Sequence, residues 1–188
     1  QVAGDGPALM PASPVYLVYS TGASVTRPGE IRFGLNRHSV EKTGVYRWDM
    51  HEQQWQLVGT RVSNGTLAGT FSSFGRYGLF IDEIAPVAGD PKVIGGALTI
   101  SVQEVGAGLN VGLIKLLVND RPVQVLFDRA QKRIVWHPAQ VFEPGGHSLR
   151  LELTDLAGNS SVWDRELDLA RLLPGPNGFM LDQNFPNP

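Results

Sequence analysis

Short apolar runs closed by glycine, proline, asparagine or aspartate repeat along this whole sequence, and they restrict its fold more than any other feature. The apolar residues do not recur at the i, i+3, i+4, i+7 spacing of an amphipathic helix over a useful window. Regular short strands with frequent turn signals are typical of β-sandwiches and barrels. We therefore predict an all-β fold made of two β-sandwich domains in tandem.

The first half of the chain contains six strand-like runs. Asn64-Gly65 stands between two of them and suits a type I′ turn, in which both central residues need positive φ. In the last run both faces are partly apolar, which predicts a central strand. The runs cover residues 15–20, 30–35, 44–49, 54–60, 66–71 and 75–82.

The second half begins after residues 83–92, which carry two prolines and a glycine and indicate a domain boundary. In residues 147–154, three leucines alternate with polar residues, as in a half-buried antiparallel strand. Seven short strands in so short a stretch fit an immunoglobulin-like sandwich. They are predicted near 92–95 and at 97–104, 111–119, 122–128, 132–137, 147–154 and 160–168. The predicted organisation is a first sandwich at 1–83, a linker at 84–92, an immunoglobulin-like sandwich at 93–169, and a linker with a tail at 170–188.

Composition argues against several functions. The 188 residues include no cysteine, are 18% charged and carry a net charge of −2, so we expect neither a nucleic-acid nor an anionic-membrane partner. No apolar run approaches the roughly 18 residues of a membrane span. The sequence contains no G-x-S-x-G motif, no cysteine nucleophile and no glycine-rich loop before a helix. We expect a protein that is not an enzyme.

Oxygen-bearing side chains are predicted to converge at one end of the second sandwich. If its strands alternate in direction, the 104–110 loop and the 155–159 turn lie at the end where the linker arrives. Calcium takes six to eight oxygen ligands, so it is the single cofactor candidate. The candidate ligands are Asp82, Glu83, Asp90, Glu104, Asp155 and Asn159. The simpler alternative is that Asp155 and Asn159 only close their own turn.

Three aromatic residues form a second candidate site. Tyr46 and Trp48 share a strand face, and Trp55 lies on the next predicted strand, so the three rings could stack on a sugar. The alternative, which large aromatic residues favour in general, is that they fill the core.

Two stretches resemble parts of bacterial immunoglobulin-like domains. GGHSLRLELTDLAGNSS at 145–161 is similar to the pattern that ends such domains. QEVGAGLN at 103–110 is similar to their D-x-G-S-G-I turn, although Glu104 stands near the usual aspartate and Ala107 replaces the serine.

The tail NGFMLDQNFPNP at 177–188 resembles the opening of the C-terminal sorting domain of type IX secretion substrates, L-x-Q-N-(Tyr/Phe)-P-N-P. The matching residues are Leu181, Gln183, Asn184, Phe185, Pro186, Asn187 and Pro188. The resemblance implies the C-terminal part of a larger protein that is secreted or held at the bacterial cell surface. Its implied partners are the upstream domains of the same protein and the secretion machinery.

These expectations lead to one predicted function and two alternatives. We predict a non-catalytic structural, spacer or interaction module. The first alternative is a carbohydrate-binding accessory module of a secreted hydrolase, which would use Tyr46, Trp48 and Trp55. The second is a subunit of an extracellular fibre, in which the tail adds a strand to an open sheet edge of a neighbouring copy.

Overall fold

The protein is almost entirely β-structure in the computed structural model, which describes residues 9–35, 41–139 and 141–173. Its strands form several antiparallel sheets, which confirms the predicted all-β sandwich fold. The chain divides into two compact units. The first takes the residues up to Val87 together with Gln103–Ile114 and Glu152–Ser161, and the second takes the remainder.

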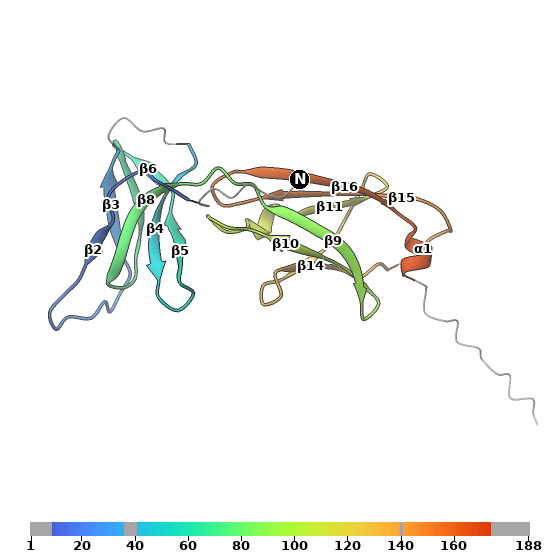
Figure 1. Cartoon of the computed structure of the whole chain (residues 1–188), viewed down its shortest axis with the longest axis horizontal. Coiled ribbons are helices and arrows are strands. Elements are labelled where there is room, and N and C mark those ends of the chain that lie inside the picture. Colours follow the sequence, from blue (N-terminus) through green and yellow to red (C-terminus); the bar gives the residue numbers. More distant parts are fainter. Residues whose placement is uncertain (1–8, 36–40, 140, 174–188) are drawn as a thin grey trace, which may run out of the picture. The chain divides into compact units, whose positions relative to one another are not determined.

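The larger sheet of the first unit is built around one central strand. Its strands are β1 (Met10–Pro11), β2 (Tyr16–Val18), β4 (Thr43–Asp49), β5 (Gln54–Gly59) and β8 (Gly75–Ile81). Their order is β1-β8-β4-β5, and β2 also pairs with β8. Figure 1 labels β8, β4 and β5, which lie side by side in this order. The central position of β8 agrees with the apolar residues on both of its faces.

A second sheet of the first unit is formed by β3 (Gly29–Gly34), β7 (Thr66–Phe71) and β6 (Arg61–Ser63), in that order. Asn64 and Gly65 join β6 to β7 with φ values of 48° and 70°, as predicted for a type I′ turn. The core contains side chains from both sheets, namely Phe33, Val45, Leu67, Tyr77 and Leu79.

The backbones of β5 and β7 in the first unit come unusually close to each other at Gly59. A Cβ atom on Gly59 would lie 2.3 Å from the carbonyl oxygen of Ala68 and 2.4 Å from Cα of Gly69. Backbone atoms cannot swing aside as a side-chain end can. Glycine at position 59 is therefore required by this close approach.

We predict that Gly59→Ala lowers the free energy of unfolding by about 1–3 kcal/mol, because overpacking forces the backbone to shift. Gly34→Ala is the matched control, since a Cβ atom on this strand glycine would meet nothing within 4 Å. The control should change stability by less than about 0.5 kcal/mol. Urea unfolding of both variants measures the difference, and equal effects would contradict the assignment.

Two four-stranded sheets follow in the second half of the chain. One contains β9 (Val87–Ile94), β10 (Ala97–Gln103), β13 (Leu126–Asp128) and β14 (Arg133–Trp136). The other contains β11 (Lys115–Val118), β12 (Arg121–Val123), β15 (His147–Thr154) and β16 (Ser160–Leu167). The orders are β13-β14-β10-β9 and β12-β11-β15-β16. Taken along the chain, this is the strand partition of an immunoglobulin-type sandwich, A-B-E-D with C′-C-F-G.

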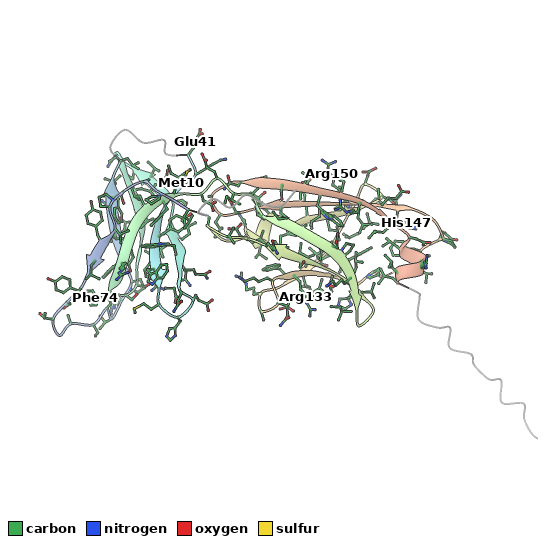
Figure 2. All side chains as sticks on the ribbon, in the orientation of Figure 1. Met10, Glu41, Phe74, Arg133, His147 and Arg150 are labelled. Carbon is green, nitrogen blue, oxygen red and sulfur yellow. The ribbon has the colours of Figure 1, made fainter. Side chains whose placement is uncertain are left out.

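Strand β15 shows the predicted alternation between a buried and a solvated face. Leu149, Leu151 and Leu153 are at most 1% exposed. Arg150, between two of them, is exposed and points away from the sheet (Figure 2). Trp136 and Trp163 are also buried, at 5% and 9% exposure.

Two predicted strands of the second half are interrupted. The run 111–119 begins with a 3-10 helix, η1 (Val111–Leu113), and only then becomes β11. The run 122–128 is divided between β12 and β13, which pair in different sheets. The chain has to leave one sheet for the other between them, so a single strand cannot cover the run.

The predicted linker 84–92 is partly a strand, because β9 begins at Val87. Pro91 lies within β9, and a proline in a strand removes one ladder donor. The strand order places β9 at a sheet edge, where that loss is tolerated. Near the end of the described chain, α1 (Leu169–Leu172) occupies the start of the second predicted linker, and Asp168 caps it through a bond from the backbone N–H of Arg171. Within the described residues, no helix is long and apolar enough to cross a membrane.

Candidate functional site

Three acidic side chains from distant parts of the sequence meet in the first unit. Asp82 follows β8, Glu104 follows β10, and Asp155 follows β15. One carboxylate oxygen from each residue lies within 4.8 Å of those of the other two. Asp82 and Asp155 are at most 1% exposed, and Glu104 is half-buried. We refer to these three residues as the acidic cluster.

Asp82 holds the loop that carries Glu104. Its Oδ1 accepts the backbone N–H of Ile84 at 3.0 Å, and its Oδ2 accepts that of Ala107 at 2.6 Å. The loop passes so close that a Cβ atom on Gly106 would lie 2.2 Å from Asp82 Oδ2. Glycine at position 106 therefore allows the loop to close over the carboxylate.

Asp155 and Asn159 close the turn between β15 and β16. Asp155 Oδ1 accepts the backbone N–H of Asn159 at 2.8 Å, and Oδ2 accepts its side-chain Nδ2 at 2.7 Å. Gly158 supplies a φ of 91°. The turn interpretation of these residues is confirmed, but the same Asn159 Nδ2 also donates to the carbonyl oxygen of Asp82 at 2.9 Å. The turn is thus tied to the end of β8.

Several polar atoms around the acidic cluster have no partner within the described residues. Glu104 Oε1 accepts the backbone N–H of Gly108 at 3.0 Å, whereas the buried Oε2 accepts no bond. Asn159 Oδ1 and the Tyr46 hydroxyl are likewise without a bond. Tyr46 is fully buried, and its ring packs with Phe80 and Ala107. Unpaired buried polar atoms of this kind are costly and need an explanation.

Burial, with a smaller contribution from neighbouring carboxylates, raises the pKa values of Glu104 and Asp82. Burial raises the pKa of Glu104 to about 7, the N–H of Gly108 opposes that shift, and the charges of Asp82 and Asp155 add to it. Burial is also the main cause that raises the pKa of Asp82, against the hydrogen bonds from Ile84 and Ala107. The pKa of Tyr46 is raised by burial and then by all three carboxylates, so its hydroxyl lies in their field.

Two residues of the predicted calcium set lie outside the acidic cluster. Glu83 is exposed, because neighbouring residues of extended chain point to opposite sides and Asp82 points inward. Asp90 is exposed on β9, in the second unit. Neither belongs to the group of carboxylates whose oxygens lie within 4.8 Å of one another.

The predicted platform of three exposed rings is wrong for Tyr46, because this side chain is fully buried. Trp48 and Trp55 are half-buried and pair edge to face at 5.5 Å between ring centroids. The ring centroid of Trp55 also lies 4.5 Å from that of Phe80, so Trp55 packs against the core. From the sequence, Tyr46 was predicted only as part of a sugar-stacking site. No local signal connected its hydroxyl with the acidic residues.

The residues of the sorting motif, Leu181 and Gln183 to Pro188, lie outside the described residues.

Comparisons with known proteins add little. No family model and no curated protein matches the chain. Among solved structures, the spore cortex lytic enzyme SleM of Clostridium perfringens is 18% identical over 61% of this chain, with a TM-score of 0.34. The match covers 38% of that structure, and at this TM-score it supports no conclusion about function.

We predict that, without divalent cations, the free energy of unfolding falls as pH rises between about 4.5 and 7. Glu104 has a pKa of about 7 in the folded chain against an ordinary value of 4.5 for glutamate, so the folded state binds more protons in that range. The stabilisation from this proton is complete below the lower value and is lost as pH rises through the upper one.

Chemical unfolding at a series of pH values measures this dependence. Glu104→Gln should flatten the profile, because the amide oxygen still accepts the N–H of Gly108 but no proton is exchanged. Glu83→Gln, the same change at an exposed neighbour of Asp82, should leave the profile unchanged. Parallel profiles for the wild type and Glu104→Gln would contradict the raised pKa.

Proposed function

We propose that this chain is a non-catalytic spacer in a larger protein that is secreted or held at the bacterial cell surface. The observation that carries the proposal is that the buried polar side chains of the candidate site bond to backbone groups far away in the sequence. Asp82 accepts a bond from Ala107, 25 residues away. Asn159 donates to the carbonyl oxygen of Asp82, 77 residues away.

A third bond joins the same regions of the chain. The hydroxyl of Ser161, at the start of β16, donates to the carbonyl oxygen of Pro86, 75 residues away. Together these bonds connect the end of β8, the loop after β10 and the turn after β15. A protein that has to keep its shape under load or near proteases gains from ties of this kind, because cleavage requires local opening.

The proposed location outside the cell rests on the C-terminal tail. The match at Leu181 and Gln183 to Pro188 to the start of a sorting domain supports export from a bacterial cell. Its partners are then the upstream domains of the same protein and, through the tail, the secretion machinery. The carbohydrate-binding alternative is weakened, because the burial of Tyr46 leaves only the edge-to-face pair of Trp48 and Trp55.

We predict that Asn159→Ala makes the whole chain more sensitive to thermolysin. The change removes the bonds from Nδ2 to Asp155 and to the carbonyl oxygen of Asp82, and it leaves buried acceptors unpaired. A loss of about 1–3 kcal/mol corresponds to roughly a 5- to 150-fold faster cleavage when opening precedes cleavage. Gel densitometry of the intact band over time gives the rate.

Ser160→Ala serves as the control, because Ser160 is exposed and its hydroxyl bonds to that of Thr154 at the surface of the same turn. The control should be cleaved at close to the wild-type rate. Rapid cleavage of the wild-type chain between residues 41 and 139 would overturn the spacer proposal.

A further inference from the structure

We propose that Asp82, Glu104 and Asp155, together with the side-chain oxygen of Asn159, bind a calcium ion. This inference rests on the proposed spacer function and deepens it, because it names the ion that joins the segments already tied by hydrogen bonds. Four of the six residues that the sequence suggested are retained.

The spacing of the carboxylate oxygens suits one coordination shell. Calcium binds oxygen at 2.3–2.6 Å, so two ligands on opposite sides of one ion lie about 5 Å apart. The three oxygens of Asp82, Glu104 and Asp155 lie within 4.8 Å of one another. They can therefore reach the same ion without a rearrangement of the loops that carry them.

Unpaired buried atoms supply a second and independent observation. Asn159 is 4% exposed, and its Oδ1 has no partner within the described residues. Its Nδ2, on the same amide group, contacts both Asp155 and the backbone of Asp82, so the free oxygen lies beside the acidic cluster. Glu104 Oε2 is buried and unpaired as well. Each is an oxygen acceptor, as a cation ligand must be.

The fully buried hydroxyl of Tyr46 completes the arrangement. It lies in the field of all three carboxylates, yet it has no partner within the described residues. A phenolic hydroxyl is both donor and acceptor, so it can bond to a water molecule on the ion or to a ligand carboxylate. A bound ion with its water would satisfy this group.

Charge also favours a cation. The three ionised carboxylates carry a formal charge of −3. Within the described residues none of them forms an ion pair with a lysine or arginine, although the more distant charge of Lys42 acts on Asp82 and lowers its pKa. The backbone N–H groups of Ile84, Ala107 and Gly108 offset part of this charge. A divalent ion would remove the remaining repulsion.

The donor set selects among metal ions. Zinc prefers nitrogen and sulfur ligands, and the acidic cluster offers only oxygen. Magnesium demands a compact octahedron with oxygens at 2.0–2.1 Å and retains its water, whereas calcium accepts longer and less regular shells. Calcium therefore suits a set of oxygen ligands that come from three separate loops.

The test is thermal unfolding of the whole chain at pH 8, after treatment with chelator and after addition of calcium or magnesium. Calcium at a hundredfold excess over its Kd should raise Tm by about 5–10 °C, and magnesium at the same concentration by less than a third of that. Calorimetric titration should give one calcium ion per chain. An absence of any Tm change at about 10 mM calcium, or an equal response to magnesium, would overturn the assignment.

Glu104→Gln separates ion binding from general stability. In chelator at pH 8 its Tm should equal or exceed that of the wild type, because a buried negative charge has been removed. In calcium most of the gain in Tm should be lost. Glu83→Gln, which removes an exposed carboxylate next to Asp82, should keep the full gain. A full calcium response in Glu104→Gln would contradict the site.

The protease assay distinguishes the two proposals. If calcium does not change Tm but the chelated chain resists chymotrypsin, a protease that needs no metal, the calcium site is wrong and the spacer proposal stands. If the chain is cut rapidly both with calcium and without it, the spacer proposal is wrong, and the calcium site is judged by the Tm and titration results alone.

Discussion

The carboxylate of Asp82 is the contact on which the loops around the candidate site depend. It lies at the end of the central strand of a five-stranded sheet, and its two oxygens fix Ile84 and Ala107. Its own backbone oxygen accepts the amide of Asn159. Hydrogen bonds to a charged group are stronger than those between neutral groups. One residue therefore holds its own chain segment, the loop after β10 and the turn after β15.

This arrangement has an electrostatic cost. Bringing Glu104 and Asp155 to Asp82 places three acids in one mostly buried group, and burial outweighs the hydrogen bonds in setting the pKa values of Asp82 and Glu104. Such a group is relieved either by a proton or by a cation. The raised pKa of Glu104, about 7, favours the proton below that pH, and the proposed calcium ion would take its place above it.

Much of the fold could be predicted because its signals are local. The leucines of 147–154 alternate, and Asn64-Gly65 carries its turn within two residues. The strands β1 and β6 were missed because two or three residues show no period. The division of 122–128 between two sheets was missed because it depends on which strands pair, and pairing is set by contacts far apart in the sequence.

The residues of the candidate site were likewise predicted where their signals are local and missed where they depend on contacts distant in the sequence. The turn of Asp155 and Asn159 is local and was recognised, and strand direction was sufficient to bring Glu104 near it. Glu83 and Asp90 were included because strand direction fixes an end of a sandwich but not the side to which a residue points. Gly106 shows the limit most clearly. It is needed only because Asp82, 24 positions earlier, places an oxygen 2.2 Å from where a Cβ atom would be, and no local pattern can express that contact.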